Sequence, residues 1–154
     1  MTPSKRLEEL KLTLPNVAAP VGSYVPAIHC GSLVMTSGQL PIRDGQLAYA
    51  GKVPGDVSLE DAADGARIAI LNALAAAAQA VGGVDAINRV VRVGVFVNSS
   101  PGFTDQAKVA NGASDLLVQI FGDAGRHVRA AVGMAELPLN AAVELELTVE
   151  VIGA

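Results

Sequence analysis

Aromatic side chains are scarce in this 154-residue chain, at 3% of residues, and there is no tryptophan. This scarcity argues against a stacking surface for single-stranded nucleic acid. The net charge of −4 points the same way, because binding a phosphate backbone requires a basic surface. Charged residues make up only 17%, below an average of about 25%, whereas 51% are hydrophobic. A small domain with so little charge is expected to cover some apolar surface with another subunit.

Cysteine and histidine are equally rare. The single cysteine, Cys30, excludes an internal disulfide and favours a reducing compartment. Its neighbour His29 cannot pair with it on a strand, where adjacent side chains point to opposite faces, so we interpret Cys30 as a buried strand residue. Two histidines and one cysteine show no metal-ligand spacing, and no metal is expected.

Long apolar runs are also missing. The N-terminus has no apolar signal-peptide core, and the longest low-polarity stretch, residues 73–84, is interrupted by Gln79 and two glycines. That stretch is too short to span a bilayer. We therefore expect a cytoplasmic protein that forms one domain over residues 1–154.

The helices are predicted from periodicity and end signals. Residues 59–81 form a long alanine-rich helix, with Ser58 as N-cap and Gly82 at its end. Residues 103–121 repeat apolar side chains at helical spacing before Gly122. A short amphipathic helix begins at Ser4 and ends before Pro15, as an N-terminal extension over residues 1–15.

The strands are predicted at residues 24–30, 33–37, 89–97, 128–136 and 142–152, with a short further strand at 46–49. Their β-β-(β)-α-β-α-β-β order implies an α+β fold with two helices packed on one face of a mixed sheet. No helix is left for the other face. That face must be solvated or buried in an oligomer.

The strand from Val128 carries the first candidate site. We predict that its more apolar face, which begins with Val128, lies under the helices. The opposite face then presents Arg129 beside the small residues Ala131 and Gly133. A guanidinium beside small residues suits a small carboxylate, although the spacing alone favours a surface arginine on an exposed sheet face. His127, two residues earlier, is a candidate for the same rim.

The last strand alternates as well. Its apolar residues face the core, so we expect Glu144, Glu146 and Glu150 to share the side of Arg129. A carboxylate near an arginine can orient water or transfer a proton, but a row of glutamates can also be merely solvated. The tight turn at Ser37 and Gly38 supplies polar donors. The chain has no P-loop, dinucleotide fingerprint or nucleophile elbow.

Four segments together resemble the RidA/YjgF family of reactive-intermediate (enamine/imine) deaminases, formerly called endoribonuclease L-PSP. The segments are residues 19–25 (APVGSYV), 34–41 (VMTSGQLP), 128–138 (VRAAVGMAELP) and 143–146 (VELE). The resemblance implies a chorismate-mutase-like fold and a homotrimer whose sheets form a central barrel, with a cleft between each pair of subunits. Such an assembly would cover the sheet face that lacks helices.

The resemblance also implies a cofactor-independent hydrolysis of 2-aminoacrylate-type 2-imino acids to 2-keto acids and ammonia. Arg129 would clamp the substrate carboxylate, and Glu144 would hold or activate the water. Tyr24, Ser37 and Gly38 match cleft positions, and Ala131 stands where the family commonly has Cys or Ser.

One spacing departs from the family. The step from Phe103 to Asn111 is longer than the family's Phe-to-Asn step, so the resemblance assigns no role to Asn111. Two alternatives to the deaminase are open. One is a non-catalytic trimer that binds a small carboxylate as a regulator, and the other is an endoribonuclease or translation inhibitor, which the acidic charge disfavours.

Overall fold

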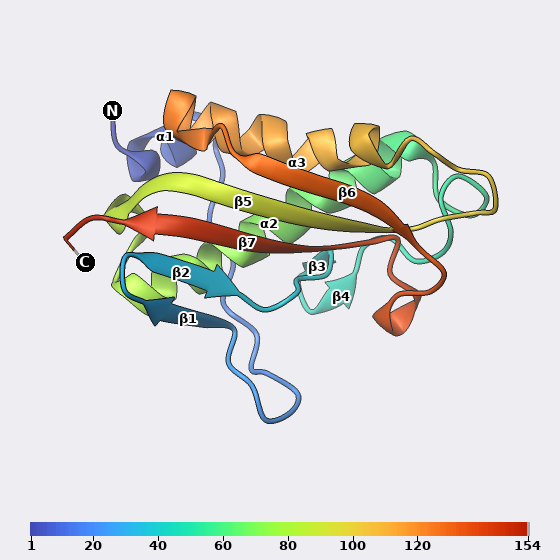
Figure 1. The fold of residues 1–154 in the computed structure, drawn as a ribbon, viewed down its shortest axis with the longest axis horizontal. Helices are drawn as coiled ribbons and strands as arrows, with labels where there is room; N and C mark the ends of the chain where they lie inside the picture. Colours follow the sequence, from blue (N-terminus) through green and yellow to red (C-terminus); the bar gives the residue numbers. More distant parts are fainter. Residues whose placement is uncertain (154) are drawn as a thin grey trace.

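A five-stranded mixed sheet forms the centre of the computed structural model, which describes residues 1–153 (Figure 1). The strand order is β1-β2-β7-β5-β6, and β5 and β6 are parallel whereas the other neighbours are antiparallel. A separate hairpin pairs β3 with β4. The strands are β1 Ala27–Cys30, β2 Leu33–Thr36, β3 Ile42–Arg43, β4 Gln46–Leu47, β5 Ile87–Asn98, β6 Val128–Met134 and β7 Val143–Val151. The α+β prediction is confirmed.

The two longer helices, α2 (Leu59–Val81) and α3 (Gln106–Phe121), cover one face of this sheet. The predicted bounds of α2 are confirmed: the Ser58 hydroxyl accepts a bond from the Asp61 amide at 3.1 Å, and Gly82 ends the helix at φ 83°. The helix α3 begins later than predicted, after the turn at Pro101 and Gly102.

The short helix α1 (Pro3–Glu9) adds a third helix, which lies against α3 and buries Leu7. It is attached to the loop after α2 through Asp85, whose carboxylate accepts bonds from the Ser4 amide at 2.8 Å and hydroxyl at 2.6 Å. These two hydrogen bonds lower the pKa of Asp85.

The predicted alternation of β7 is confirmed. Its residues 143, 145, 147, 149 and 151 are all buried beneath the helices, and the intervening Glu144, Glu146, Thr148 and Glu150 are half-buried on the other side. Short side chains on α2 allow this packing, since Ala69, Ala73 and Ala77 are wholly buried. The core therefore lies entirely on the helix side of the sheet.

The predicted facing of β6 is wrong. In the register of the sheet, Arg129 lies opposite Val93, and Val93 lies opposite Leu147, so all three side chains point to the helix side. Val128 and Val132 instead point away from the helices and are 67% and 43% exposed. Apolar content misled the prediction, because β6 is an edge strand whose inner side is occupied by α3.

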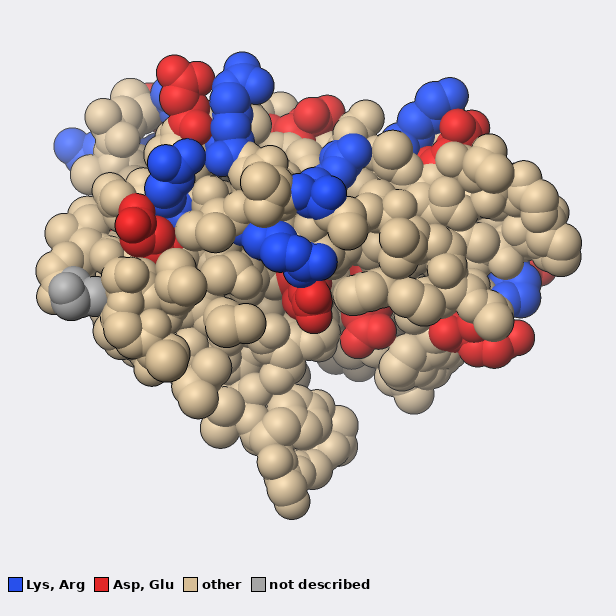
Figure 2. All heavy atoms as spheres, viewed as in Figure 1, with Lys and Arg blue, Asp and Glu red and all other residues tan. Residues whose placement is uncertain are grey.

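We call the side of the sheet without helices the bare face. Among its residues are Ile28, Met35, Phe96, Val128, Val132, Glu144 and Glu146. Ile28 and Met35 are 57% and 50% exposed, and Cys30 on the edge strand β1 is exposed as well, which corrects its predicted burial. Residues 12–42 contain no Asp, Glu, Lys or Arg, and the lower part of the molecule in Figure 2 accordingly shows no charge.

Candidate functional site

Arg129 extends from β6 to α3. Its Nη1 donates to the Asn111 Oδ1 at 2.8 Å and to the Ser114 Oγ at 3.1 Å, and its Nη2 makes a longer contact of 3.4 Å with the Ala107 carbonyl. The sequence left Asn111 without a role. Only the folded chain brings it, 18 residues away, to the guanidinium.

His127 lies on the same rim as Arg129, as the sequence suggested. Its Nε2 is 2.9 Å from the Ser114 Oγ, and its Nδ1 is 2.6 Å from the Gly125 carbonyl oxygen. Ser114 thus contacts both His127 and Arg129. Together with Val118 these three residues border a polar cavity of about 250 Å³ on the helix side of the sheet edge.

The small residues of β6 do not form the open surface that their size suggested. A Cβ on Gly133 would lie 2.9 Å from the Gln106 Nε2 and from the Ser99 Oγ, so the first turn of α3 already occupies that space. Ala131 is half-buried and packs against the core. Small side chains are therefore needed here for close packing of α3 on the sheet.

Glu144 and Gly38 form a second group, on the bare face. A Cβ on Gly38 would lie 2.3 Å from the Glu144 Oε1, so glycine leaves the space that this carboxylate occupies. Partial burial, with a smaller effect from nearby Glu146, raises the pKa of Glu144. The start of β7 is held to this loop by a pair of backbone hydrogen bonds between Gln39 and Leu145, at 2.7 and 3.0 Å.

Two other predicted cleft residues, Ser37 and Tyr24, precede Gly38 in the same part of the sequence. The Ser37 hydroxyl donates to the Val25 carbonyl at 2.6 Å and so holds the preceding loop to the end of β2. Tyr24 lies in that loop and is 48% exposed. Ser37, Gly38 and Glu144 are therefore brought together, with Tyr24 on the attached loop.

Arg129 and Glu144 are not brought together within one chain. Glu144 pairs with Phe96, and Phe96 pairs with Val132, all on the bare face, whereas Arg129 points to the helix side. The prediction that Glu144 shares the side of Arg129 is thus wrong. It followed from the reversed facing of β6.

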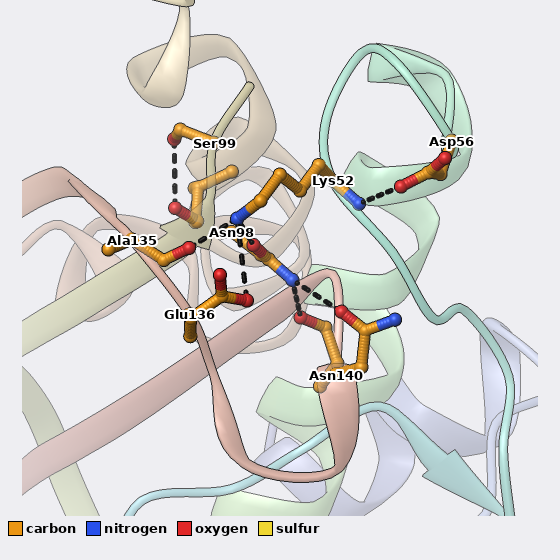
Figure 3. Close-up of polar contacts among 9 residues, drawn as sticks. Lys52, Asp56, Asn98, Ser99, Ala135, Glu136 and Asn140 are labelled. Carbon is orange, nitrogen blue, oxygen red and sulfur yellow. Dashed lines mark hydrogen bonds and ion pairs between the residues drawn. The ribbon is translucent and has the colours of Figure 1, made fainter. Parts of the chain in front are cut away.

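The sequence missed a further polar cluster, around Lys52 (Figure 3). The Lys52 ammonium donates to the Asn98 Oδ1 at 2.8 Å and to the Ala135 carbonyl, and it lies 3.5 Å from the Glu136 carboxylate. Asn98 is wholly buried, and its amide donates to the Asn140 Oδ1 at 3.2 Å. Since Asn98 ends β5 and Asn140 precedes β7, the cluster fixes the loop that leads to Glu144. No motif in the sequence signals these contacts.

Across residues 1–153, no three His, Cys, Asp or Glu side chains are grouped so that they could hold a metal ion. No helix of the described chain has both the length and the apolarity needed to cross a membrane.

Comparisons with known proteins identify the family to which this mixed sheet with helices on one face belongs. A family model described as "YjgF/chorismate mutase-like, putative endoribonuclease" matches residues 4–151. This chain therefore belongs to the RidA/YjgF family.

Several known proteins are similar to the chain. Protein TCP17 of Trypanosoma cruzi is 43% identical over 94% of this chain and 91% of its own length. A solved "putative endoribonuclease" from Shewanella oneidensis is 38% identical with a TM-score of 0.94, covering 98% of this chain and all of that one (100%). Escherichia coli TdcF, solved with bound serine, is 25% identical with a TM-score of 0.63, covering 90% of this chain and 94% of that one.

Proposed function

We propose that this protein is a cofactor-independent deaminase that hydrolyses reactive 2-imino acids to 2-keto acids and ammonia. The observation that carries the proposal is the exposure and hydrogen bonding of the Arg129 side chain. Arg129 presents an exposed guanidinium whose Nη1 is tied to α3, whereas no hydrogen bond within residues 1–153 involves its Nε. The Nε and Nη2 donors on the side edge are parallel, which is the geometry that a carboxylate accepts.

Hydrolysis also requires a group that accepts and returns protons of the attacking water, and Glu144 is our candidate. Hydrolysis adds the water oxygen to the C=N carbon and transfers both water protons to the nitrogen. The C–N bond then breaks with its electron pair leaving on ammonia, as the C=O bond of the keto acid forms. A half-buried carboxyl group with a raised pKa suits both the acceptance and the return of a proton. Gly38 leaves that carboxyl group accessible beside the loop that carries Ser37 and Tyr24.

A site with both groups has to combine two subunits. Arg129 and Glu144 lie on opposite sides of the sheet in one chain, so a single small molecule between them requires Arg129 of one subunit and Glu144 of its neighbour. The exposed apolar side chains Ile28, Met35 and Val132 support an assembly that covers the bare face. We propose the homotrimer that the family resemblance implies, in which each of three clefts takes Arg129 from one subunit and Glu144 from its neighbour.

The bound serine named for TdcF is consistent with a site for a small amino-acid-like carboxylate. Carboxylate binding alone would equally suit a regulator. Turnover is therefore the property that separates the proposed enzyme from a binding protein.

The first experiment measures turnover. An amino-acid oxidase generates imines in situ, semicarbazide traps them, and the purified protein is expected to release keto acid before the trap reacts. Arg129→Ala should lower kcat/KM about a hundredfold through loss of positioning. Arg129→Lys should be nearly as poor, because an ammonium lacks the parallel donors. If short, branched and aromatic imines are all trapped unchanged, the deaminase proposal fails.

A mixing experiment tests the shared site. Arg129→Ala and Glu144→Ala chains are each expected to be inactive. When equal amounts are unfolded together and refolded, about a quarter of the interfaces in a random trimer regain both intact residues. Activity should then recover to about a quarter of wild type. If the site lay within one chain, every site would carry one defect and no activity would return.

A further inference from the structure

A row of three hydrogen bonds connects Arg129 to the backbone at the end of α3. Arg129 Nη1 contacts the Ser114 Oγ at 3.1 Å, Ser114 Oγ contacts the His127 Nε2 at 2.9 Å, and His127 Nδ1 contacts the Gly125 carbonyl oxygen at 2.6 Å. Of the four residues in this row, only Arg129 lies in a segment that carries the family resemblance.

With a neutral His127 ring, the donors and acceptors in this row have one consistent order. A carbonyl oxygen can only accept, so the His127 Nδ1 carries a proton and donates to Gly125. In the neutral ring the Nε2 is then an acceptor, and the Ser114 hydroxyl donates its proton to it. The lone pairs of the Ser114 Oγ are left to accept from Arg129, which can only donate.

This order fixes the guanidinium. The two protons of Nη1 go to Ser114 and Asn111, both on α3, so the plane of the group cannot rotate without breaking a bond. The longer 3.4 Å contact of Nη2 with the Ala107 carbonyl uses one of the two Nη2 protons, so Nε and the other Nη2 proton stay available for a ligand. If Ser114 turned its proton toward Arg129, two donors would face each other and the guanidinium would lose one of its two anchors.

We infer that His127 and Ser114 are positioning residues: by fixing the direction of the Ser114 hydroxyl, His127 orients Arg129 so that its Nε–Nη2 edge is presented to a carboxylate. This inference rests on the proposed function for its ligand, a small 2-oxo or 2-imino acid. His127 acts only through Ser114 and Arg129.

Binding of pyruvate, a 2-oxo acid, measured by titration calorimetry tests the inference without any turnover. His127→Phe keeps a planar ring but removes both hydrogen bonds, and Ser114→Ala removes the link itself. Each is expected to weaken pyruvate binding about five- to tenfold, the effect of losing one hydrogen bond. Ser114→Thr keeps a hydroxyl and should stay within about twofold of wild type.

The matched controls are His29→Gln, which changes the only other histidine, and Gln119→Ala, an exposed residue of α3 that does not line this cavity. Both should bind like wild type.

The decisive comparison repeats His127→Phe in an Arg129→Ala background. There it should cause no further loss, because the orientation of an absent side chain cannot matter.

The inference is overturned if His127→Phe and Ser114→Ala bind pyruvate like wild type, or if His127→Phe has the same effect without Arg129. Circular dichroism establishes that each variant is folded, and Ser114→Ala decides the matter if the phenylalanine variant is not. Pyruvate binding through Arg129 without imine hydrolysis would remove the deaminase proposal and leave this inference intact. No pyruvate binding by wild type, or wild-type affinity in Arg129→Ala, would overturn this inference, whereas imine turnover decides the deaminase proposal.

Discussion

Both faces of the sheet carry apolar side chains, but those side chains differ in their burial. On the helix side, Val95, Leu145 and Leu147 are buried to 1% exposure or less. On the bare face, Met35, Val128 and Val132 keep half or nearly half of their surface in contact with solvent, next to the carboxylates of Glu144 and Glu146. One face stabilises the single chain, and the other is available to a neighbour.

The candidate site is divided between these faces in the same way. Arg129 depends on the helix side, because its anchors Asn111 and Ser114 belong to α3. Glu144 depends on the bare face, where Gly38 leaves it room. The proposed chemistry therefore needs both the folding of one chain and the association of several. Variants on the two faces should separate these requirements.

The largest difference is expected between Val95→Asp and Val132→Asp. An aspartate at the wholly buried Val95 places an unpaired carboxylate in the core, and we expect the chain not to fold. At Val132, which is 43% exposed, the carboxylate reaches water, so the chain should fold but associate poorly. Circular dichroism and light scattering distinguish the two. Unfolding of Val132→Asp would contradict the division between the faces.

The contact between α2 and α3 should be nearly as sensitive. A Cβ on Gly112 would lie 2.0 Å from the backbone carbonyl oxygen of Ala63, which cannot move without separating the helices. Gly112→Ala should therefore lower the free energy of unfolding by about 2–3 kcal/mol, despite the better helix propensity of alanine. Gly133→Ala, for which the three nearest atoms to the added Cβ belong to side chains, is the control with a smaller loss in urea denaturation.

On the bare face, Gly38→Ala should affect activity more than stability. The added Cβ displaces the end of the flexible Glu144 side chain and no backbone atom, so the free energy of unfolding should change by less than about 1 kcal/mol. Imine hydrolysis should fall about a hundredfold if Glu144 handles the proton. Equal activity in Gly38→Ala and wild type would exclude Glu144, in its present position, from the reaction.

The smallest effect concerns the pH dependence of stability. Because the folded chain raises the pKa of Glu144, it holds that proton more tightly than the unfolded chain. Stability should therefore fall as pH rises from the ordinary value of 4.5 through the raised pKa. Glu144→Gln removes this loss, so it should be more stable than wild type at neutral pH and lose that advantage well below 4.5. Urea denaturation at both pH values measures the difference, and a constant advantage would contradict it.

Local features of the fold were predictable where one strong signal acted alone. Ser58 and Gly82 mark the ends of α2, and the strict alternation of β7 identifies its buried face. The edge strand β6 was not predictable in this way. Its face with Val128 and Val132 is the larger and more apolar one, so apolar content favoured burial of that side. The parallel register with β5 decided otherwise.

The sequence by itself determined the helices, the strand order along the chain and the residue types that resemble the family, because these depend on local propensity and periodicity. Only the tertiary structure decided that Arg129 joins Asn111, Ser114 and His127, and that Glu144 faces the other way. Such contacts depend on strand pairing and helix docking between distant segments. One residue of register turns a side chain from one face to the other.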